Sequence, residues 1–372
     1  MFTCLFILRN LVRQPVTSAL TLAGVSLGIA TVVALGAVTR GVESSALLTL
    51  QAGNADFVVA QRTSGGLMFS SMTEEDAGRL ERMEGVDFAT AVIVFISRVG
   101  RDPFFRTIGI EPVQLQRVGF PVVEGRPLEP GVAGEAFLGD RAAHQLGART
   151  GETVTMAGRS FVVSGIFRTG NRWLDAGAFA PMDEVQELAA RPGLITMVYM
   201  RSNPPGSGPR LAEDIRLAFP HLTTISNLSE FGEVDQGLRV LSAMNVAVTA
   251  IAAVVAAVGV MNTMARSVFE RTREIGILRA IGWRKRRVLG MVVGEAVVLC
   301  LIGGVAGSVA GAVATETLEM ASQSVRSLVG PAYGVELFVR SAALALAVAL
   351  AGAVYPAYRA ARLEPLDALR SE

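Results

Sequence analysis

Four long apolar segments are separated by polar stretches along the chain. Three of them contain no charged residue, and the remaining one contains only Glu295. The first covers 24 residues, and a helix of that length extends about 36 Å at ~1.5 Å per residue, which exceeds the ~30 Å hydrocarbon core of a bilayer. The pattern therefore predicts four membrane-spanning helices, at residues 16–39, 240–265, 288–315 and 341–358.

The polar region at residues 40–239 has the pattern of a folded domain. Strand-like runs rich in β-branched and aromatic residues occur at 56–60, 91–99, 104–110, 152–156, 160–167 and 195–200. Helix-like segments alternate with them, at 73–83, 140–146, 183–190 and 209–219. Thr73 followed by Asp76 is typical of a helix N-terminal cap. We therefore expect an integral membrane α-helical protein with a large α+β domain inserted between its first and second spans.

Basic residues predict which ends of the spans face the cytoplasm, because Lys and Arg near span ends resist translocation. The loop at 266–287, between the second and third spans, carries eight basic residues and two acidic ones. Arg9 and Arg13 precede the first span, and the tail at 359–372 carries three arginines. Four spans place all of these residues inside, so both termini are expected to be cytoplasmic.

The other segments follow from this orientation. Residues 40–239 and the shorter loop at 316–340 are predicted to lie outside the cytoplasm. Residues 1–15 are apolar with interspersed arginines and are interpreted as a helix along the inner membrane surface. The alternative that residues 16–39 form a cleaved signal peptide is disfavoured, because a signal core is usually only ~7 to 15 residues long.

The basic loop also contains a predicted short amphipathic helix. Ile275, Ile277, Leu278 and Ile281 fall on one broad helical arc, and Gly282 follows as a plausible helix stop. We expect this helix to lie at the inner membrane surface.

Composition excludes several classes of protein. The 372 residues are 51% hydrophobic with a mean hydropathy of +0.45, which argues against a wholly soluble protein. The net charge of +1 argues against nucleic acid as a partner. The two cysteines, Cys4 and Cys300, both lie outside residues 40–239, so the polar domain is predicted to fold without disulfides.

Two glycine patterns allow more than one interpretation. Gly24, Ser26 and Gly28 match the nucleophile motif of serine hydrolases, but a motif inside a predicted span cannot form the required strand-to-helix turn. The same two glycines are four residues apart, a spacing repeated by Gly303, Gly307 and Gly311. Such glycines let helices approach closely, for packing or dimerisation, although glycine is also simply frequent in spans.

Few residues suggest chemistry within the chain. Glu295 lies about 12 Å past Arg287 along its helix, where it could pair with a nearby arginine or take part in transmission or conduction. His144 and His221 are far apart in sequence, and no metal site is expected from them. No phosphate-binding loop occurs, so energy is expected to come from a partner.

Several motifs together resemble a known family. MNTM at 261–264, ERTREIGILRAIGWRKRR at 270–287, Glu295 and the ending YPAYRAARLEPLDALRSE are similar to permease subunits of the MacB/LolC/FtsX type of ABC transporter. The first span and parts of residues 138–167 resemble the same family. The resemblance implies a multi-pass protein of the bacterial inner membrane.

The resemblance also implies partners. A cytoplasmic ABC ATPase dimer on separate chains would bind ATP and Mg²⁺, so no cofactor is expected in this chain. A second permease subunit, identical or paralogous, would complete the transporter, and an extracytoplasmic partner protein stays open. On the matching positions, the ATPase-coupling segment would comprise Glu274, Ile275, Gly276, Arg279, Ala280 and Gly282. A basic loop that only fixes topology is the simpler alternative.

Three hypotheses about function follow, and none of them is an enzyme. The first is a permease subunit that couples ATP hydrolysis by a separate ATPase to movement of its outer domain, for export or extraction of a lipidic, peptide or drug-like substrate. The second is a transmitter of force or signal to an extracytoplasmic cell-wall enzyme, as in the FtsX branch. The third is a membrane-anchored receptor without energy input.

Overall fold

The computed structural model describes residues 15–50, 55–62, 67, 70–227, 230, 236–321 and 330–362. The chain divides into two compact units, which we call the helical unit and the sheet unit. The helical unit comprises Met1–Thr39, Ala243–Thr317 and Pro331–Glu372, and the sheet unit comprises Arg40–Ser242 and Leu318–Gly330. Residues 1–14 of the predicted interfacial helix at 1–15, and most of the tail at 359–372, lie outside the described residues.

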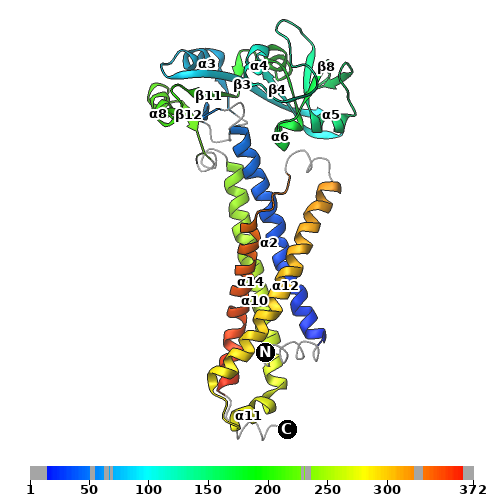
Figure 1. Ribbon diagram of the computed structural model, residues 1–372, viewed down its shortest axis with the longest axis vertical. Helices are drawn as coiled ribbons and strands as arrows, with labels where there is room; N and C mark the ends of the chain where they lie inside the picture. The colour runs from blue at the N-terminus through cyan, green and yellow to red at the C-terminus, as the bar shows by residue number, and fades with distance from the viewer. Residues whose placement is uncertain are drawn as a thin grey trace. The chain divides into compact units, whose positions relative to one another are not determined.

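Four long helices form the helical unit (Figure 1). They are α2 (Pro15–Leu50), α10 (Gln236–Glu270), α12 (Lys285–Ala321) and α14 (Val335–Ala361). Each is long and apolar enough to cross a membrane, which agrees with the four predicted spans. The helices continue beyond the predicted spans, because a helix does not need to end where the apolar run ends. The limits of the spans themselves stay predictions.

Small side chains fill the centre of the helical unit. One buried cluster joins all four helices and includes Val33, Val260, Ala296 and Ala349, each with no exposed surface. Small residues let helix backbones approach closely, which favours association where lipid removes the hydrophobic drive between helices. The short helix α11 (Thr272–Ala280) lies at one end of the bundle, between α10 and α12 in the chain (Figure 1).

A ten-stranded mixed sheet forms the centre of the sheet unit. Its strand order is β12-β1-β11-β3-β4-β9-β6-β8-β5, and β7 pairs with β8 outside this order. The β4/β9 and β6/β8 pairs are parallel, and the other pairs are antiparallel. The strands are β1 (Phe57–Gln61), β3 (Val86–Val99), β4 (Asp102–Ile110), β5 (Val122–Gly125), β6 (Glu135–Gly139), β7 (Thr153–Met156), β8 (Arg159–Phe167), β9 (Gly177–Pro181), β11 (Met197–Ser202) and β12 (Leu222–Ile225). Two short strands, β2 (Met72–Thr73) and β10 (Leu194–Ile195), pair separately.

Both faces of the sheet are covered by apolar layers. Along β3, Ile93 belongs to one buried cluster while Val92 and Val94 belong to the other, as the two-residue period of a strand requires. Helices α3 (Glu74–Glu81), α5 (Asp140–Leu146), α7 (Met182–Leu188) and α8 (Gly208–Ala218) contribute to the first cluster. Helices α4 (Pro112–Val118) and α6 (Arg172–Asp175) contribute to the second.

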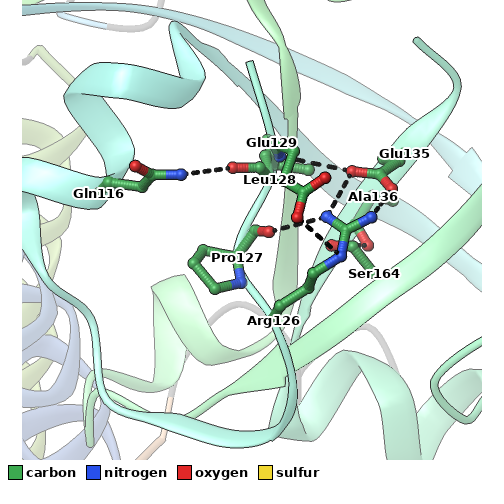
Figure 2. A network of polar contacts seen from close by, with 8 residues as sticks. All are labelled: Gln116, Arg126, Pro127, Leu128, Glu129, Glu135, Ala136 and Ser164. Carbon is green, nitrogen blue, oxygen red and sulfur yellow. Dashed lines mark hydrogen bonds and ion pairs between the residues drawn. The ribbon is translucent and has the colours of Figure 1, made fainter. Parts of the chain in front are cut away.

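An arginine-centred network fixes the connection between β5 and β6 (Figure 2). Arg126 donates two hydrogen bonds to the carboxylate of Glu135, one of them over 3.1 Å, and a third to the carbonyl of Pro127. The pairing with Glu135 raises the pKa of Arg126. Nearby, the amide of Gln116 donates to the carbonyl of Leu128 over 3.2 Å. The loop thus gains a defined backbone course without regular secondary structure.

The structure confirms the expected α+β domain and adds elements that the pattern did not predict. All six predicted strands are present with shifted ends, and Thr73 forms the predicted N-terminal cap, accepting from the backbone N–H of Asp76 over 3.1 Å. Strands β2, β5, β6, β9 and β12 and helices α4 and α6 were missed, and the predicted strand at 195–200 divides into β10 and β11. In β6 and β9 every residue is buried, so neither shows the alternation by which a strand is recognised.

Candidate functional site

The predicted amphipathic helix in the basic loop exists as α11. It begins after Arg271, where α10 has ended at Glu270. It ends in a Schellman motif. The N–H of Gly282 donates to the carbonyl of Arg279 over 3.1 Å, and the N–H of Trp283 donates to the carbonyl of Leu278 over 3.0 Å. Gly282 has φ of 101°, a backbone conformation that favours glycine, so its predicted role as a helix stop is confirmed.

The apolar residues of α11 do not form the single face that the sequence suggested. Ile275 is 2% exposed and belongs to the same buried cluster as Val288 of α12. Ile277 and Ile281 are 42% and 74% exposed. One edge of the predicted arc therefore packs into the helical unit, while the other edge presents two isoleucines four residues apart. The predicted single apolar arc is therefore wrong. Neighbouring helices cover only one edge of it, and the spacing of apolar residues in the sequence does not show where those helices lie.

An ion pair ties the start of α11 to α12. Arg271 Nη1 donates to Glu295 Oε2 over 3.3 Å, and the two side chains are only 11% and 8% exposed. Separating or removing either partner of a buried pair is costly, because the other charge then stays uncompensated in a poorly solvated site. The sequence left two interpretations of Glu295 open, and Arg271 is the arginine partner that one of them requires.

The six predicted coupling residues lie together on α11 and its C-terminal turn, but they face different ways. Glu274, Ala280 and Gly282 are exposed, whereas Ile275 and Gly276 are buried. Arg279 is partly buried, and its Nε has no hydrogen-bond partner among the described residues. The exposed members and Ile277 and Ile281 form a surface that we call the α11 surface.

The three glycines of α12 pack against α2 within the same chain. An ideal Cβ on Gly307 would lie 2.4 Å from the carbonyl oxygen of Ser26, and one on Gly311 would lie 2.6 Å from that of Ala30. The hydroxyl of Ser26 donates to the carbonyl of Gly303 over 3.0 Å. The helix that these glycines of α12 approach closely is therefore α2 of the same chain.

The glycines of α2 behave differently. A Cβ on Gly24 would meet nothing within 4 Å, and one on Gly28 would have only an ordinary contact, 3.7 Å from Ala252 of α10. The two glycine patterns therefore do not pack against each other.

Two packing features of the helical unit were not predicted. On α14, Ala345, Ala349, Ala353 and Ala357 are fully buried at four-residue spacing. The same small-residue rule that singled out the glycines would have found this stripe if alanine had been included. The second feature is a hydrogen bond between the buried hydroxyls of Thr21 and Thr263, which joins α2 to α10 and has no sequence signal that we recognise.

Comparisons with known proteins match both parts of this architecture. The family profile described as MacB-like periplasmic core domain matches residues 18–218, and that described as FtsX-like permease C-terminal matches residues 246–365. The crystallised periplasmic region of MacB from Actinobacillus actinomycetemcomitans is 16% identical, with a TM-score of 0.39, over 50% of this chain and 96% of that chain.

Relatives of this chain are named as transporter components. An uncharacterized ABC transporter permease of Methanocaldococcus jannaschii is 26% identical over 99% of this chain and 97% of its own length. A macrolide export ATP-binding/permease protein MacB of Nitrobacter winogradskyi is 28% identical over 96% of this chain, which spans 58% of that protein. A pyoverdine export ATP-binding/permease protein of Pseudomonas syringae is 40% identical over 36% of this chain and 19% of its own length. The chain belongs to the family of ABC transporter permeases that combine a MacB-like periplasmic core domain with an FtsX-like membrane region.

Proposed function

We propose that this permease is a non-catalytic subunit moved by a separate cytoplasmic ATPase dimer, which docks on the α11 surface. The observation that carries the proposal is a pair of exposed isoleucines, Ile277 in α11 and Ile281 at its C-cap, on an element that Ile275 anchors in the bundle. Because the two isoleucines are four residues apart on one side of α11, they form a contiguous apolar patch that a partner protein could cover. A loop that only fixed topology would need its basic residues, but it would not need a capped helix with an apolar exposed edge.

The contacts of α11 suit the transmission of force. Ile275 anchors the helix in the buried cluster, and the Arg271–Glu295 pair joins its first turn to α12. A push on α11 would therefore move α10 and α12 instead of being absorbed by a flexible connection. ATP and Mg²⁺ would be bound by the ATPase, with both termini of the permease in the cytoplasm of a bacterial cell.

A second permease subunit, identical or paralogous, would pack on the least covered helix. Only 6% of the most apolar 18-residue window of α10 is buried within the chain, against 50% for α12.

Gly24 on α2, which has open space around it, offers a further close approach. We expect Gly24→Leu to lower the dimer fraction in nanodiscs. An unchanged fraction would remove Gly24 from this interface.

The substrate class proposed is lipidic, peptide or drug-like, exported or extracted at the outer side of the membrane. The names of the relatives, which refer to macrolide and pyoverdine export, support export over a receptor function. The matching FtsX-like region supports the alternative of force transmission to a cell-wall enzyme, which would use the same α11 surface.

The test is reconstitution with the partner ATPase and measurement of stimulated ATP hydrolysis. For the double variant Ile277→Asp/Ile281→Asp we expect the affinity of the permease for the partner ATPase to fall about 30-fold, as for loss of an interface hot spot of ~2 kcal/mol. The ATPase concentration that gives half-maximal stimulation should rise by the same factor. Glu274→Lys and Gly282→Pro should also lose stimulation. The matched control is Leu217→Asp, which changes a 73% exposed residue of the sheet unit. Unchanged stimulation in the double isoleucine variant would overturn docking on the α11 surface.

A further inference from the structure

A groove of about 470 Å³ lies between α12 and α14 in the helical unit. Along α12 its wall runs from Leu301 to Glu316, with lining residues three or four apart, and this stripe is about 22 Å long at ~1.5 Å per residue. Along α14 its wall is formed by Phe338, Ala342 and Ala345. Among the described residues that line it, Ser308 and Glu316 are the polar ones.

The groove exists because the two helices touch at one level and separate beyond it. An ideal Cβ on Gly304 would lie 3.3 Å from Cβ of Ala345, so the helices are in contact there. Toward the C-terminal end of α12 they diverge, as Figure 1 shows. The start of α14 is held instead by α2, where Leu337 packs so closely on Gly36 that an added Cβ would lie 2.7 Å from Leu337 Cδ1.

The far end of the groove is also fixed. The hydroxyl of Tyr333 hydrogen-bonds the hydroxyl of Thr315 over 2.6 Å and donates to the carbonyl of Ala312 over 3.2 Å. The backbone N–H of Ala332 donates to the carbonyl of Ala37 on α2 over 3.0 Å. The segment before α14 thus links α2 and α12, and the separation of α14 from α12 is built into the packing.

The polar groups of the groove limit what it can select. The hydroxyl of Ser308 is already used, because it donates to the carbonyl of Gly304 over 2.8 Å within its own helix. Glu316 is exposed at the end of the groove that the predicted orientation places outside, and no ion pair or hydrogen bond of its side chain is present among the described residues. Inside a bilayer an alkyl chain gains little by exchanging lipid for an apolar groove, so the carboxylate is the group that can discriminate between ligands.

We propose that this groove binds a cationic amphiphile, with its apolar chain along α12 and its protonated amine beside Glu316. A cavity of this size is typical of sites for one small apolar ligand with few polar contacts. A phospholipid fits less well, because its phosphate would be brought near the carboxylate of Glu316. That the amphiphile is a transported substrate rests on the proposed export function, whereas binding itself does not.

The experiment is equilibrium binding of labelled dodecylamine to the full chain in phosphatidylcholine nanodiscs, with dodecanol as the uncharged probe of equal chain length. We expect the wild type to prefer the amine by about two- to fivefold, the range of one solvent-exposed ion pair. Glu316→Gln should abolish this preference and keep binding of dodecanol. The matched control is Glu336→Gln, which removes an exposed carboxylate of α14 that does not line the groove.

A second pair of variants tests the location. Ala312→Phe fills the groove and should abolish binding of both probes, whereas Ala314→Phe, two residues away on the exposed side of α12 and outside the lining, should leave it unchanged. Equal binding by wild type and Ala312→Phe, or a preference for the amine that survives Glu316→Gln, would overturn the proposal. No ATPase is present in this assay, so its failure would leave docking on the α11 surface untouched.

Discussion

Arg271 Nη1 lies 3.3 Å from Glu295 Oε2, and this contact joins the break between α10 and α11 to the first half of α12. Both side chains are about nine-tenths buried. The two residues are 24 positions apart, so the pair depends on the fold and not on local helix geometry. Its position makes it a polar connection between the start of α11 and α12.

Removing one member of this pair should destabilise the helical unit strongly. In Glu295→Ala the guanidinium of Arg271 stays buried without its partner, and we expect a loss of about 3–5 kcal/mol. The measurement is thermal or denaturant unfolding of the full chain in detergent. The matched control is Glu270→Ala at the exposed pair of Arg266 and Glu270, where the expected loss is below about 0.5 kcal/mol. Equal losses at the two sites would show that the Arg271–Glu295 pair is not buried in the folded protein.

Replacing both members separates stability from coupling. In Arg271→Met/Glu295→Leu no charge stays buried, so stability should return close to that of the wild type. If the pair transmits force, stimulated ATP hydrolysis should still fall by about 2- to 30-fold, the range for residues that carry coupling between sites. Full stimulation in a stable double variant would restrict the pair to a structural role.

The sequence predicted the existence of α11 better than its orientation. Gly282 signals a helix end by a local rule, since few other residues adopt its positive φ, and the structure agrees. The burial of Ile275 and the exposure of Ile277 depend on where α12 lies, and the spacing of residues does not contain that position. For the same reason the sequence offered eight basic residues near Glu295 and could not select Arg271.

The sheet unit shows the same division between local and long-range information. The cap of α3 was predicted because Thr73 and Asp76 satisfy each other within one turn. Strands β6 and β9 were missed because they are short and buried on both faces, and their pairing is set by partners such as Phe137 and Phe179, 42 positions apart. Periodicity finds half-buried strands and amphipathic helices, whereas central strands are defined by their neighbours.

Alanine substitutions at the glycines of α12 should show which of these glycines stabilise the packing of α12 against α2. In Gly307→Ala the new Cβ would lie 2.4 Å from the backbone oxygen of Ser26, so the two helices must separate, and we expect a loss of about 1–3 kcal/mol. Gly290→Ala on the same helix is the matched control, because nothing lies within 4 Å of its added Cβ. Unfolding of the full chain in detergent compares the two. A tolerated Gly307→Ala would mean that α2 and α12 are farther apart than in this structure.

The sheet unit should lose some stability as the pH rises through the range in which Glu111 ionises. Burial raises the pKa of Glu111, and the nearby carboxylates of Asp183 and Glu74 raise it further. The folded state therefore keeps the proton at a pH where the unfolded chain has released it, so stability falls with rising pH until Glu111 is ionised in both states.

Glu111→Gln removes this penalty, and we expect it to stabilise the sheet unit at about pH 7 and to have little effect at about pH 4. Because much of the side chain is solvated, the gain should stay below about 1 kcal/mol, which corresponds to roughly 2–4 °C in Tm for a unit of this size. Thermal unfolding of the full chain at both pH values tests this, with the exposed Glu81 of α3 changed to Gln as the control. A gain that is the same at both pH values would contradict an origin in the ionisation of Glu111, since only a charge-dependent penalty disappears when the carboxyl group is protonated.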